Sequence, residues 1–338
     1  MTRVLVYEYC TAQGLGRSES DPAHSLFREG KAMRDALLAD LQSADDIEAI
    51  SIDEADGDPE DAIRDGADGC DWVVVIAPEL DGILERCSDA VWETDARLLG
   101  PAVETIRLTA DKLAMYERWD EFFLPTPPTW TIEDWTGKRF PVIWKPRRGA
   151  GSTATFRLNS TEDVEAIRTA ATAEGYPDAK LVVQPFAHGL PASVSFLVGP
   201  DDAIPMIPTF QLISADGRFR YQGGELPIHP DLAERAVELG RKAVECTPHL
   251  LGYVGVDLVL GESPDGSRDV VIEINPRLTT SYVGLREAAR FNIAEAMVKV
   301  ASGEEIPEPR WKPGRVRFRA DGSIERLAGA EKYFRGTL

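Results

Sequence analysis

The spacing of apolar and polar residues divides the chain into two regions of different architecture. In the first hundred residues, apolar runs at 3–9 and 72–76 have the composition of strands buried in a parallel sheet. Each run is followed by a stretch with helical periodicity; after the first, the apolar positions are Leu26, Met33, Leu37 and Leu41. This order predicts a small α/β domain over residues 1–105. Its strand 3–9 is expected to end in a glycine-containing loop.

The region from residue 141 onward reads instead as strands joined by turns. Runs at 142–145 and 153–158 predict a hairpin with a long glycine-containing tip. Ser160 and Asp163 predict a capped helix to about 174, before a strand at 180–184, and Asp231 with Glu234 predicts a second capped helix. Two further strands are expected at 253–260 and 269–275. The predicted division is therefore 1–105, 106–186 with the glycine loop, 187–310, and a basic, strand-like appendage at 311–338.

The pair of strands at 253–275 carries the most informative polar residues. Asp257 lies within an apolar strand, where an isolated carboxylate is costly to bury. Glu273 and Asn275 are two residues apart and so share one face of the second strand. If the strands pair antiparallel, three oxygen ligands converge, a set suited to Mg²⁺ or Mn²⁺ with phosphate oxygens completing the shell. The alternative is a solvated polar face of an edge strand.

A cationic glycine loop follows the buried strand at 142–145. It begins at Lys145 and continues through Arg147 and Arg148 to Gly149, Gly151 and Ser152. Backbone N–H groups of such a loop approach phosphate closely, and the cations supply charge-assisted hydrogen bonds. Neither the P-loop nor the Rossmann glycine pattern occurs in the chain. The loop therefore predicts a polyphosphate site of another type, the alternative being a basic surface turn.

Gln184, Pro185 and Phe186 end the strand that starts near residue 180. An extended backbone here could hydrogen-bond an adenine edge while apolar side chains enclose the ring. An ordinary strand end with a proline is the alternative. The four histidines show no metal-ligand spacing, and His188 is singled out only because it is close to this strand.

Composition narrows the partner classes. The 338 residues include 37 Lys+Arg and 57 Asp+Glu, a formal charge of −20, and 43% of residues are hydrophobic. This is a globular composition whose negative charge disfavours nucleic acid and membrane surfaces as partners. No apolar run approaches the roughly 18 residues that span a bilayer, so a cytoplasmic protein is expected. The cysteines are far apart, which predicts reduced, buried thiols.

The order of these elements resembles the ATP-grasp superfamily over nearly the whole chain. The resemblance rests on Asp111-Lys112, the strand ending at Lys145, the glycine loop, the strand at 184–186, Gly-Val-Asp257 and Glu273-Ile-Asn-Pro-Arg277. It implies an α/β pre-ATP-grasp domain followed by two α+β subdomains that sandwich ATP. It further implies Lys112 and Lys145 on the phosphates, closure of the 147–153 loop, adenine against 184–186, and Mg²⁺ on Asp257, Glu273 and Asn275. Many relatives have an acidic residue beside the adenine strand, where this chain has Gln184-Pro185.

A narrower likeness concerns the tyramine-glutamate ligase family of methanofuran biosynthesis. It rests on the segments 6–9, 27–33, 77–82, 108–112 and 126–129. This resemblance implies a carboxylate-amine ligase that forms an amide through an acylphosphate. L-Glutamate is the expected acid, and tyramine, tyrosine or a similar amine is the expected acceptor.

Within that hypothesis two arginines are candidate catalytic residues. Arg277 would lie beside the metal site and hold the carboxylate or acylphosphate, and Arg220 is a second candidate. The segment around Glu8, Tyr9 and Gly14 follows the first strand and is expected to contact the amine. An ATP-dependent small-molecule kinase and a non-catalytic nucleotide sensor are the alternatives. A homodimer is left open.

Overall fold

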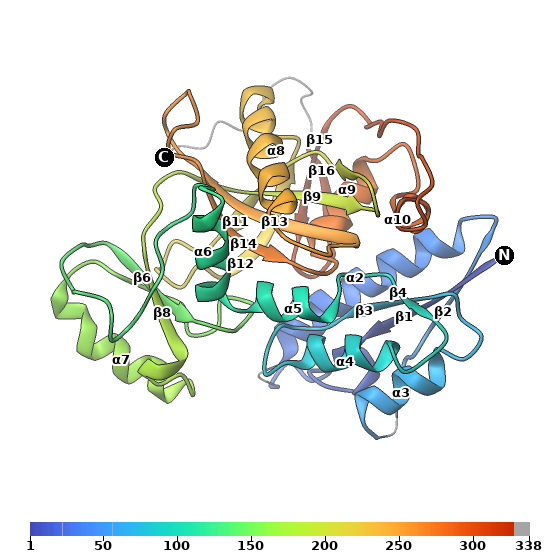
Figure 1. Ribbon diagram of the computed structural model, residues 1–338, viewed down its shortest axis with the longest axis horizontal. Helices are drawn as coiled ribbons and strands as arrows, with labels where there is room; N and C mark the ends of the chain where they lie inside the picture. Colours follow the sequence, from blue (N-terminus) through green and yellow to red (C-terminus); the bar gives the residue numbers. More distant parts are fainter. Residues whose placement is uncertain (22, 56, 328–338) are drawn as a thin grey trace.

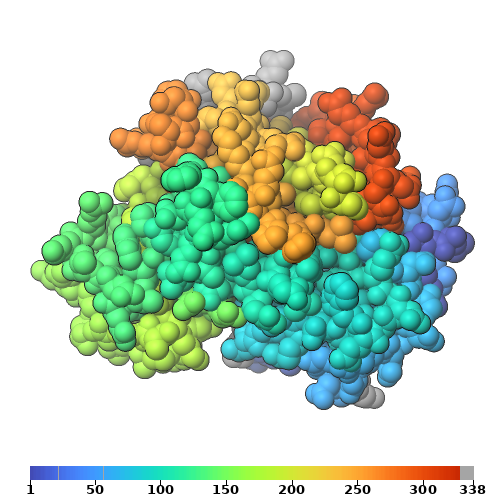
Figure 2. Space-filling model, in the orientation of Figure 1, coloured from blue at the N-terminus to red at the C-terminus, as the bar shows by residue number. Residues whose placement is uncertain are grey.

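Three β-sheets organise the chain in the computed structural model, which describes residues 1–21, 23–55 and 57–327. In Figure 1 a parallel sheet with its helices lies at the lower right, a small antiparallel sheet at the lower left, and a large sheet above both. In the space-filling view of Figure 2, the green part of the chain on the left and the cyan and blue part at the lower right lie side by side beneath the yellow and orange part. The parallel sheet is formed by strands of the first hundred residues, and both antiparallel sheets are formed by strands after residue 129.

The N-terminal sheet is parallel and has the strand order β2-β1-β3-β4. Its strands are β1 (Thr2–Glu8), β2 (Ile47–Ser51), β3 (Trp72–Ile76) and β4 (Arg97–Leu98). The helices of this region are α1 (Tyr9–Ala12), α2 (His24–Gln42), α3 (Pro59–Gly66), α4 (Ile83–Val91) and α5 (Val103–Ala110). All five residues of β3 are buried, as a parallel strand covered on both faces requires. The predicted α/β domain is confirmed.

The end of β1 differs from the expected loop. Tyr9 begins the one-turn helix α1, and the loop with Gly14 follows that turn. The turn forms because the Glu8 carboxylate accepts hydrogen bonds from the backbone N–H groups of Cys10 and Thr11. A cap of this kind does not show in the hydrophobic pattern.

The small sheet is antiparallel, with the strand order β5-β8-β6-β7. It contains β5 (Trp130–Thr131), β6 (Val142–Pro146), β7 (Phe156–Leu158) and β8 (Leu181–Pro185), with α7 (Val164–Ala173) and the short turns η1 (Thr161–Asp163) and η2 (Asp178–Lys180). The predicted hairpin and the Ser160 capping box are both confirmed. The second hairpin strand is shorter than predicted because Ser152 and Ala154 have positive φ, which ends the extended conformation.

The large sheet is built around the long strand β9. Its order is β14-β13-β9-β11-β12-β15-β16, with β10 beside β9. The strands are β9 (Leu190–Val198), β10 (Ala203–Pro205), β11 (Thr209–Ile213), β12 (Tyr221–Leu226), β13 (Gly252–Leu260), β14 (Val270–Asn275), β15 (Arg315–Arg319) and β16 (Ile324–Leu327). The helices here are α8 (Pro230–Glu245), α9 (Ser281–Ala288) and α10 (Ile293–Ala301).

Two helices depart from the sequence predictions. Helix α8 is capped by the His229 side chain, which accepts from the Asp231 backbone N–H, so the predicted Asp231 cap is wrong. Pro230 explains this start, since proline suits the first helical position. Helix α6 (Lys112–Glu121) buries Met115 and Trp119 in the core of the large sheet, although it falls in the predicted 106–186 subdomain.

The C-terminal segment is not the appendage that the sequence predicted. Strand β15 pairs with β12, and β16 pairs with β15 at the edge of the large sheet. Phe318 of β15 is fully buried, and its ring packs where Gly224 and Gly284 leave room for it. This pairing joins strands about ninety positions apart, beyond the reach of local patterns. Residues 328–338, the rest of the expected appendage, lie outside the described residues.

The cysteines and the membrane expectation need only brief comment. All four thiols are free; Cys10, Cys70 and Cys87 are buried as predicted, whereas Cys246 is half-buried. No helix within the described ranges is both long and apolar enough to cross a membrane.

The position of Phe318 generates a stability prediction. Phe318→Ala should lower the free energy of unfolding by about 3–5 kcal/mol, because it leaves a cavity in a packed core. Chemical denaturation followed by circular dichroism measures the change. Ile324→Ala on the neighbouring β16, where the side chain is exposed, should stay within about 0.5 kcal/mol of the wild type. If Phe318→Ala changed the free energy of unfolding as little as Ile324→Ala, Phe318 would not be part of the core.

Candidate active site

One cleft of about 560 Å³ lies between the small sheet and the large sheet. Its walls come from β6 and β8 on one side and from β9, β11, β12, β13 and β14 on the other. The glycine loop and residues after β14 complete it. Volumes of this size are typical of sites for nucleotides and other small molecules.

The antiparallel pairing of β13 and β14 brings the acidic residues together. Asp257 stands opposite Glu273, and Asn275 stands opposite Gly255. The Asn275 amide donates to Asp257 Oδ2 at 3.1 Å, and Gln211 of β11 donates to Asp257 Oδ1 at 2.8 Å. The structure thus places the three predicted metal ligands side by side, all lining the cleft.

Two lysines face this acidic pair. Lys112, at the start of α6, has its Nζ 3.8 Å from Glu273 Oε2. Lys145, at the end of β6, is buried beside it. Burial and the Lys112 charge lower the pKa of Lys145 to about 8, since both disfavour a second ammonium ion. The cleft therefore holds four ionisable groups within one small volume.

The acidic pair is electrostatically frustrated. Burial and the adjacent Glu273 charge raise the pKa of Asp257 above its ordinary value. Burial acts in the same direction on Glu273, but Lys112 and Lys145 outweigh it and hold the pKa of that carboxyl below its usual value. Two neighbouring carboxylates of which one resists ionisation form a site that a divalent cation would relieve.

The donor set fits a hard cation such as Mg²⁺ with an incomplete protein shell. Two carboxylates and the amide oxygen of Asn275 are oxygen ligands of the kind Mg²⁺ and Mn²⁺ prefer. Within the described ranges, no cluster of three or more His, Cys, Asp or Glu residues could hold a metal ion by itself. An ion here would need further oxygens from a ligand or water, which is the usual situation of Mg²⁺ in phosphate-binding sites.

The residues of the glycine loop fall into two groups. Gly149, Gly151 and Ser152 line the cleft. Two hydrogen bonds hold the loop there: the Lys112 ammonium donates to Gly149 O at 3.0 Å, and Ser152 Oγ donates to Phe219 O at 2.7 Å. Arg148 is half-exposed and is not among the described lining residues.

The two arginines of the loop instead bind Asp111. Arg147 donates to both Asp111 oxygens at 2.8 and 3.0 Å, and Arg148 donates at 3.3 Å. Asp111 is buried and also caps α6 by accepting from the N–H groups of Leu113 and Ala114. The arginines thereby anchor the start of the loop to the helix that carries Lys112.

Gln184, Pro185 and Phe186 line the opposite end of the cleft. The Gln184 side-chain amide donates to Thr129 Oγ1 at 2.8 Å, so its NH2 group already has a partner within the protein. The Phe186 N–H donates to Pro141 O at 3.0 Å. Because proline lacks an N–H, the neighbouring Ala187 is the better backbone donor for a purine edge, and it too lines the cleft.

Aromatic rings close this end of the cleft. The Phe186 ring contacts His188 edge-on at 4.8 Å and Phe219 at 6.1 Å, and the Arg157 guanidinium lies 4.2 Å over it. An aromatic and apolar enclosure is suited to a planar base. The proximity of His188 noted from the sequence therefore reflects packing against Phe186.

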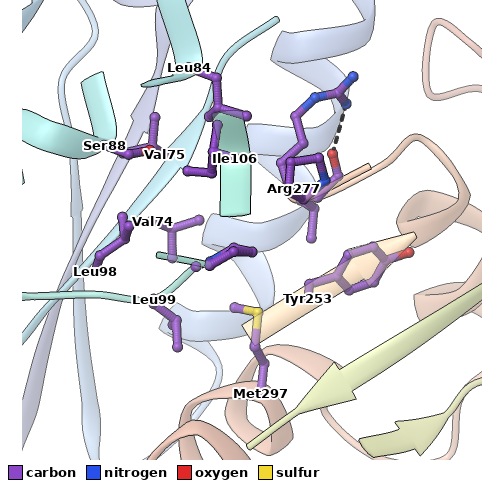
Figure 3. A pocket seen from close by; sticks show the side chains of 14 residues that line it. Val74, Val75, Leu84, Ser88, Leu98, Leu99, Ile106, Tyr253, Arg277 and Met297 are labelled. Atoms are coloured by element: carbon purple, nitrogen blue, oxygen red, sulfur yellow. Dashed lines mark hydrogen bonds between the residues drawn. The ribbon is translucent and has the colours of Figure 1, made fainter. Parts of the chain in front are cut away.

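Arg277 lies at the junction of the N-terminal domain and the large sheet. Its Nη2 donates to Glu79 Oε2 at 2.7 Å, and its Nη1 donates to Leu278 O at 3.1 Å. In Figure 3 it stands at the edge of a small apolar cavity, which Val74 and Val75 of β3 and Tyr253 of β13 also line. Arg277 lines the main cleft as well, so it joins both domains to the site.

Arg220 and the N-terminal segment are placed elsewhere. Arg220 has a side chain 65% exposed, pairs with Asp216, and is not among the described residues that line the cleft. Glu8, Tyr9 and Gly14 are likewise absent from that lining, and Glu8 is occupied in capping α1. The structure does not bring these predicted residues to the site.

Several cleft residues were not singled out in the sequence analysis, among them Glu29, Ala187, Gln211 and Tyr221. Glu29 of α2 lines the cleft close to Arg277, and Gln211 bonds directly to Asp257. Glu29 lies within the 27–33 segment that carries the narrower family likeness, but the sequence analysis assigned no role to it. Gln211 lies on β11, where the sequence shows no motif, and its place in the site is apparent only from its hydrogen bond to Asp257.

Comparison with known families decides the class of protein. Residues 109–281 match the ATP-grasp domain, and residues 31–106 match the pre ATP-grasp 3 domain. The chain belongs to the ATP-grasp family. Its fold is accordingly the ATP-grasp fold, and its class is that of the ATP-grasp ligases, as the motif order predicted.

Individual relatives agree with this assignment. The chain is 26% identical to a tyramine–L-glutamate ligase of Methanocaldococcus fervens, over 90% of this chain and 95% of that protein. An ATP-grasp superfamily protein from Archaeoglobus fulgidus has a similar structure, with a TM-score of 0.69, 24% identity, and coverage of 94% and 92% of the two chains. A carboxyaminoimidazole ribonucleotide synthase from Aspergillus clavatus, solved with ATP, has a TM-score of 0.65 at 18% identity over 94% and 81%.

The anchoring role of Asp111 can be tested by substitution. Asp111→Ala should lower the free energy of unfolding by about 1–3 kcal/mol, because it leaves a helix N-terminus and two arginines without their acceptor. Asp120→Ala, at an exposed position of the same helix, should change stability by less than about 0.5 kcal/mol.

The pH dependence gives a second reading of the same contact. Burial raises the pKa of Asp111, but hydrogen bonds from Arg147 and Ala114 outweigh it and leave the pKa below its ordinary value. Its stabilisation is thus complete above the ordinary aspartate pKa and is lost as pH falls through the folded-state value. The stability gap between wild type and Asp111→Ala should shrink in acid; a gap independent of pH would contradict the ion-pair account.

Proposed function

We propose that the protein is an ATP-dependent carboxylate-amine ligase that forms an amide through an acylphosphate. The observation that carries this proposal is the charge cluster of Lys112, Lys145, Asp257 and Glu273 in one cleft with an aromatic end. Such a cluster suits the polyphosphate of ATP, and the aromatic end suits its base. The ATP-grasp family membership supports the same ligand.

Residue roles follow from position. Adenine would lie beside Phe186 and Ala187, with the triphosphate directed toward Lys145, Lys112 and the N–H groups of the glycine loop.

Asp257, Glu273 and Asn275 would hold Mg²⁺, which when bound supplies charge neutralisation for the phosphate oxygens. Gln211 would keep the Asp257 carboxylate oriented toward the ion.

The chemistry then needs no protein nucleophile. A substrate carboxylate held near Arg277 attacks the terminal phosphoryl group and displaces ADP, and an amine then attacks the acylphosphate and displaces phosphate. The lysines and Arg277 act by positioning and by stabilising the charge of the transferring group. Arg277 is suited to this because Glu79 and Leu278 O fix its guanidinium while its remaining N–H groups stay available.

For substrates we propose L-glutamate as the acid and tyramine, tyrosine or a similar aromatic amine as the acceptor. The support is the likeness to tyramine–L-glutamate ligases, which extends over 90% of the chain. A small-molecule kinase would have the same nucleotide site, but it would release a stable phosphorylated product. A sensor would bind the nucleotide without turnover.

The metal assignment predicts a specific loss of activity. Asp257→Asn and Glu273→Gln should each reduce turnover by about 100-fold or more, since each removes a charge that holds the ion and keeps a near-isosteric amide. Release of ADP as Mg²⁺ is varied measures this, with circular dichroism as the folding control.

A matched substitution lies in the turn of the same hairpin. Asp265→Asn also converts a carboxylate to an amide, but at an exposed position. Its turnover should equal that of the wild type. Near-normal turnover of both Asp257→Asn and Glu273→Gln would contradict the proposal that these carboxylates hold a metal ion.

The substrate assignment is tested by product analysis. Protein incubated with ATP, Mg²⁺, L-glutamate and tyramine should yield the γ-glutamyl amide by mass spectrometry, with one ADP and one phosphate for each amide. Omission of either substrate should abolish amide formation. If ADP appears only with an unrelated acid and amine, the ligase class stands and these substrates do not.

A further inference from the structure

Glu29 is the contribution of the N-terminal domain to the cleft. Among the described lining residues, every other one comes from residue 112 or later. Helix α2 packs directly against the end of β1 because Gly30 lies beside Glu8, where an added Cβ would come within 2.1 Å of the carboxylate. Leu26 of the same helix lies beside Gly151 of the glycine loop. Helix α2 therefore packs on the N-terminal domain through Gly30 and approaches the glycine loop through Leu26, which brings Glu29 to the cleft.

The Glu29 carboxylate has no cation of its own. Among the described residues, none of the ion pairs involves Glu29, and the nearby Arg277 is already paired with Glu79 at 2.7 Å. Burial raises the pKa of Glu29 to about 7, although Arg277 and the Thr280 hydroxyl act in the opposite direction. A largely buried carboxylate without a dedicated cation is costly unless a ligand supplies one.

The neighbours of Arg277 locate Glu29 relative to the chemistry. Arg277 interacts with Glu273 of the proposed metal site and also with Glu29. Tyr221 of β12 also lines the cleft, and burial together with the charges of Asp257 and Glu29 raises the pKa of its hydroxyl. A carboxylate activated at Arg277 would thus have Glu29 close by, where the negative charge attracts a cationic group and repels a second acid.

We propose that Glu29 binds the ammonium group of the acceptor amine and takes up one of its protons as the amine attacks the acylphosphate. This inference rests on the ligase function proposed above and assigns the acceptor end of the cleft. It also defines the acceptor class: an amine that arrives as a cation.

The protons and bonds balance without any further reactant. The ammonium nitrogen carries three protons and the amide nitrogen keeps one. Glu29 takes the first as the amine becomes nucleophilic, the C–N bond forms, and the C–O bond to phosphate breaks. The departing phosphate takes the second proton, and Glu29 returns its own to solvent when the product leaves.

Two acceptors separate this role from activation of the acid. Tyramine arrives as an ammonium ion, whereas hydroxylamine is largely neutral near pH 7 and traps acylphosphates as hydroxamates without needing a base. Wild-type protein and Glu29→Gln are each supplied with ATP, Mg²⁺ and L-glutamate, and with one acceptor at a time. We expect Glu29→Gln to lose about 100-fold or more of its turnover with tyramine while hydroxamate formation stays within about threefold of the wild type.

Controls use the same helix. Asp35→Asn is also a carboxylate-to-amide change in α2, but at a half-exposed side chain that pairs with Lys31 and Arg34 and is not among the described lining residues, so it should match the wild type with both acceptors. Glu29→Asp, which keeps the charge on a shorter side chain, should lose less turnover with tyramine than Glu29→Gln. An ATP-dependent rise in melting temperature shows that each variant is folded, and Glu29→Asp decides the matter if Glu29→Gln does not fold.

The remaining outcomes overturn the inference in different ways. Glu29→Gln that matches the wild type with tyramine would show that the carboxylate has no role. Equal losses with both acceptors, in either variant, would assign Glu29 to activation of glutamate instead. Wild-type protein that makes neither product would overturn the proposed substrates, and this inference with them.

Discussion

The pairing of Asp257 with Glu273 across β13 and β14 is the constraint around which the cleft is built. Burial and the repulsion between the two adjacent carboxylates raise the pKa of Asp257, so cations nearby are needed to stabilise the pair. Lys112, at the start of α6, and Lys145, on β6 of the small sheet, supply them. Folding thereby leaves a set of charges that is only partly balanced, and a nucleotide with its metal ion would complete the balance.

This arrangement explains why elements far from the cleft matter to it. Lys112 is positioned by α6, whose first turn is capped by Asp111. Asp111 also binds Arg147, which starts the glycine loop, so helix and loop are fixed together. On the other side, Arg277 is fixed by Glu79 of the N-terminal domain. The N-terminal domain therefore contributes to the site through an ion pair with Arg277 and through Glu29.

Local pattern predicted the parts of the site that lie on adjacent strands. It was possible to predict that Asp257, Glu273 and Asn275 lie together, because strand alternation shows which residues share a face and a short connection indicates which strands pair. Contacts between distant segments could not be predicted in this way. Arg148 belongs to the cationic loop, yet its side chain binds Asp111 and does not line the cleft. Glu29 and the pairing of β15 with β12 depend on how domains and strands far apart in sequence meet, which no local period encodes.

The charge cluster as a nucleotide site is tested most directly by calorimetric titration of ATP with Mg²⁺ into Lys145→Ala and Arg148→Ala. Loss of the buried lysine removes a charge-assisted contact worth about 1.5–3 kcal/mol, so Lys145→Ala should bind ATP roughly 10- to 150-fold more weakly. Arg148→Ala, whose side chain is half-exposed and directed to Asp111, should stay within a few-fold of the wild type. Unchanged ATP affinity in Lys145→Ala would contradict the account.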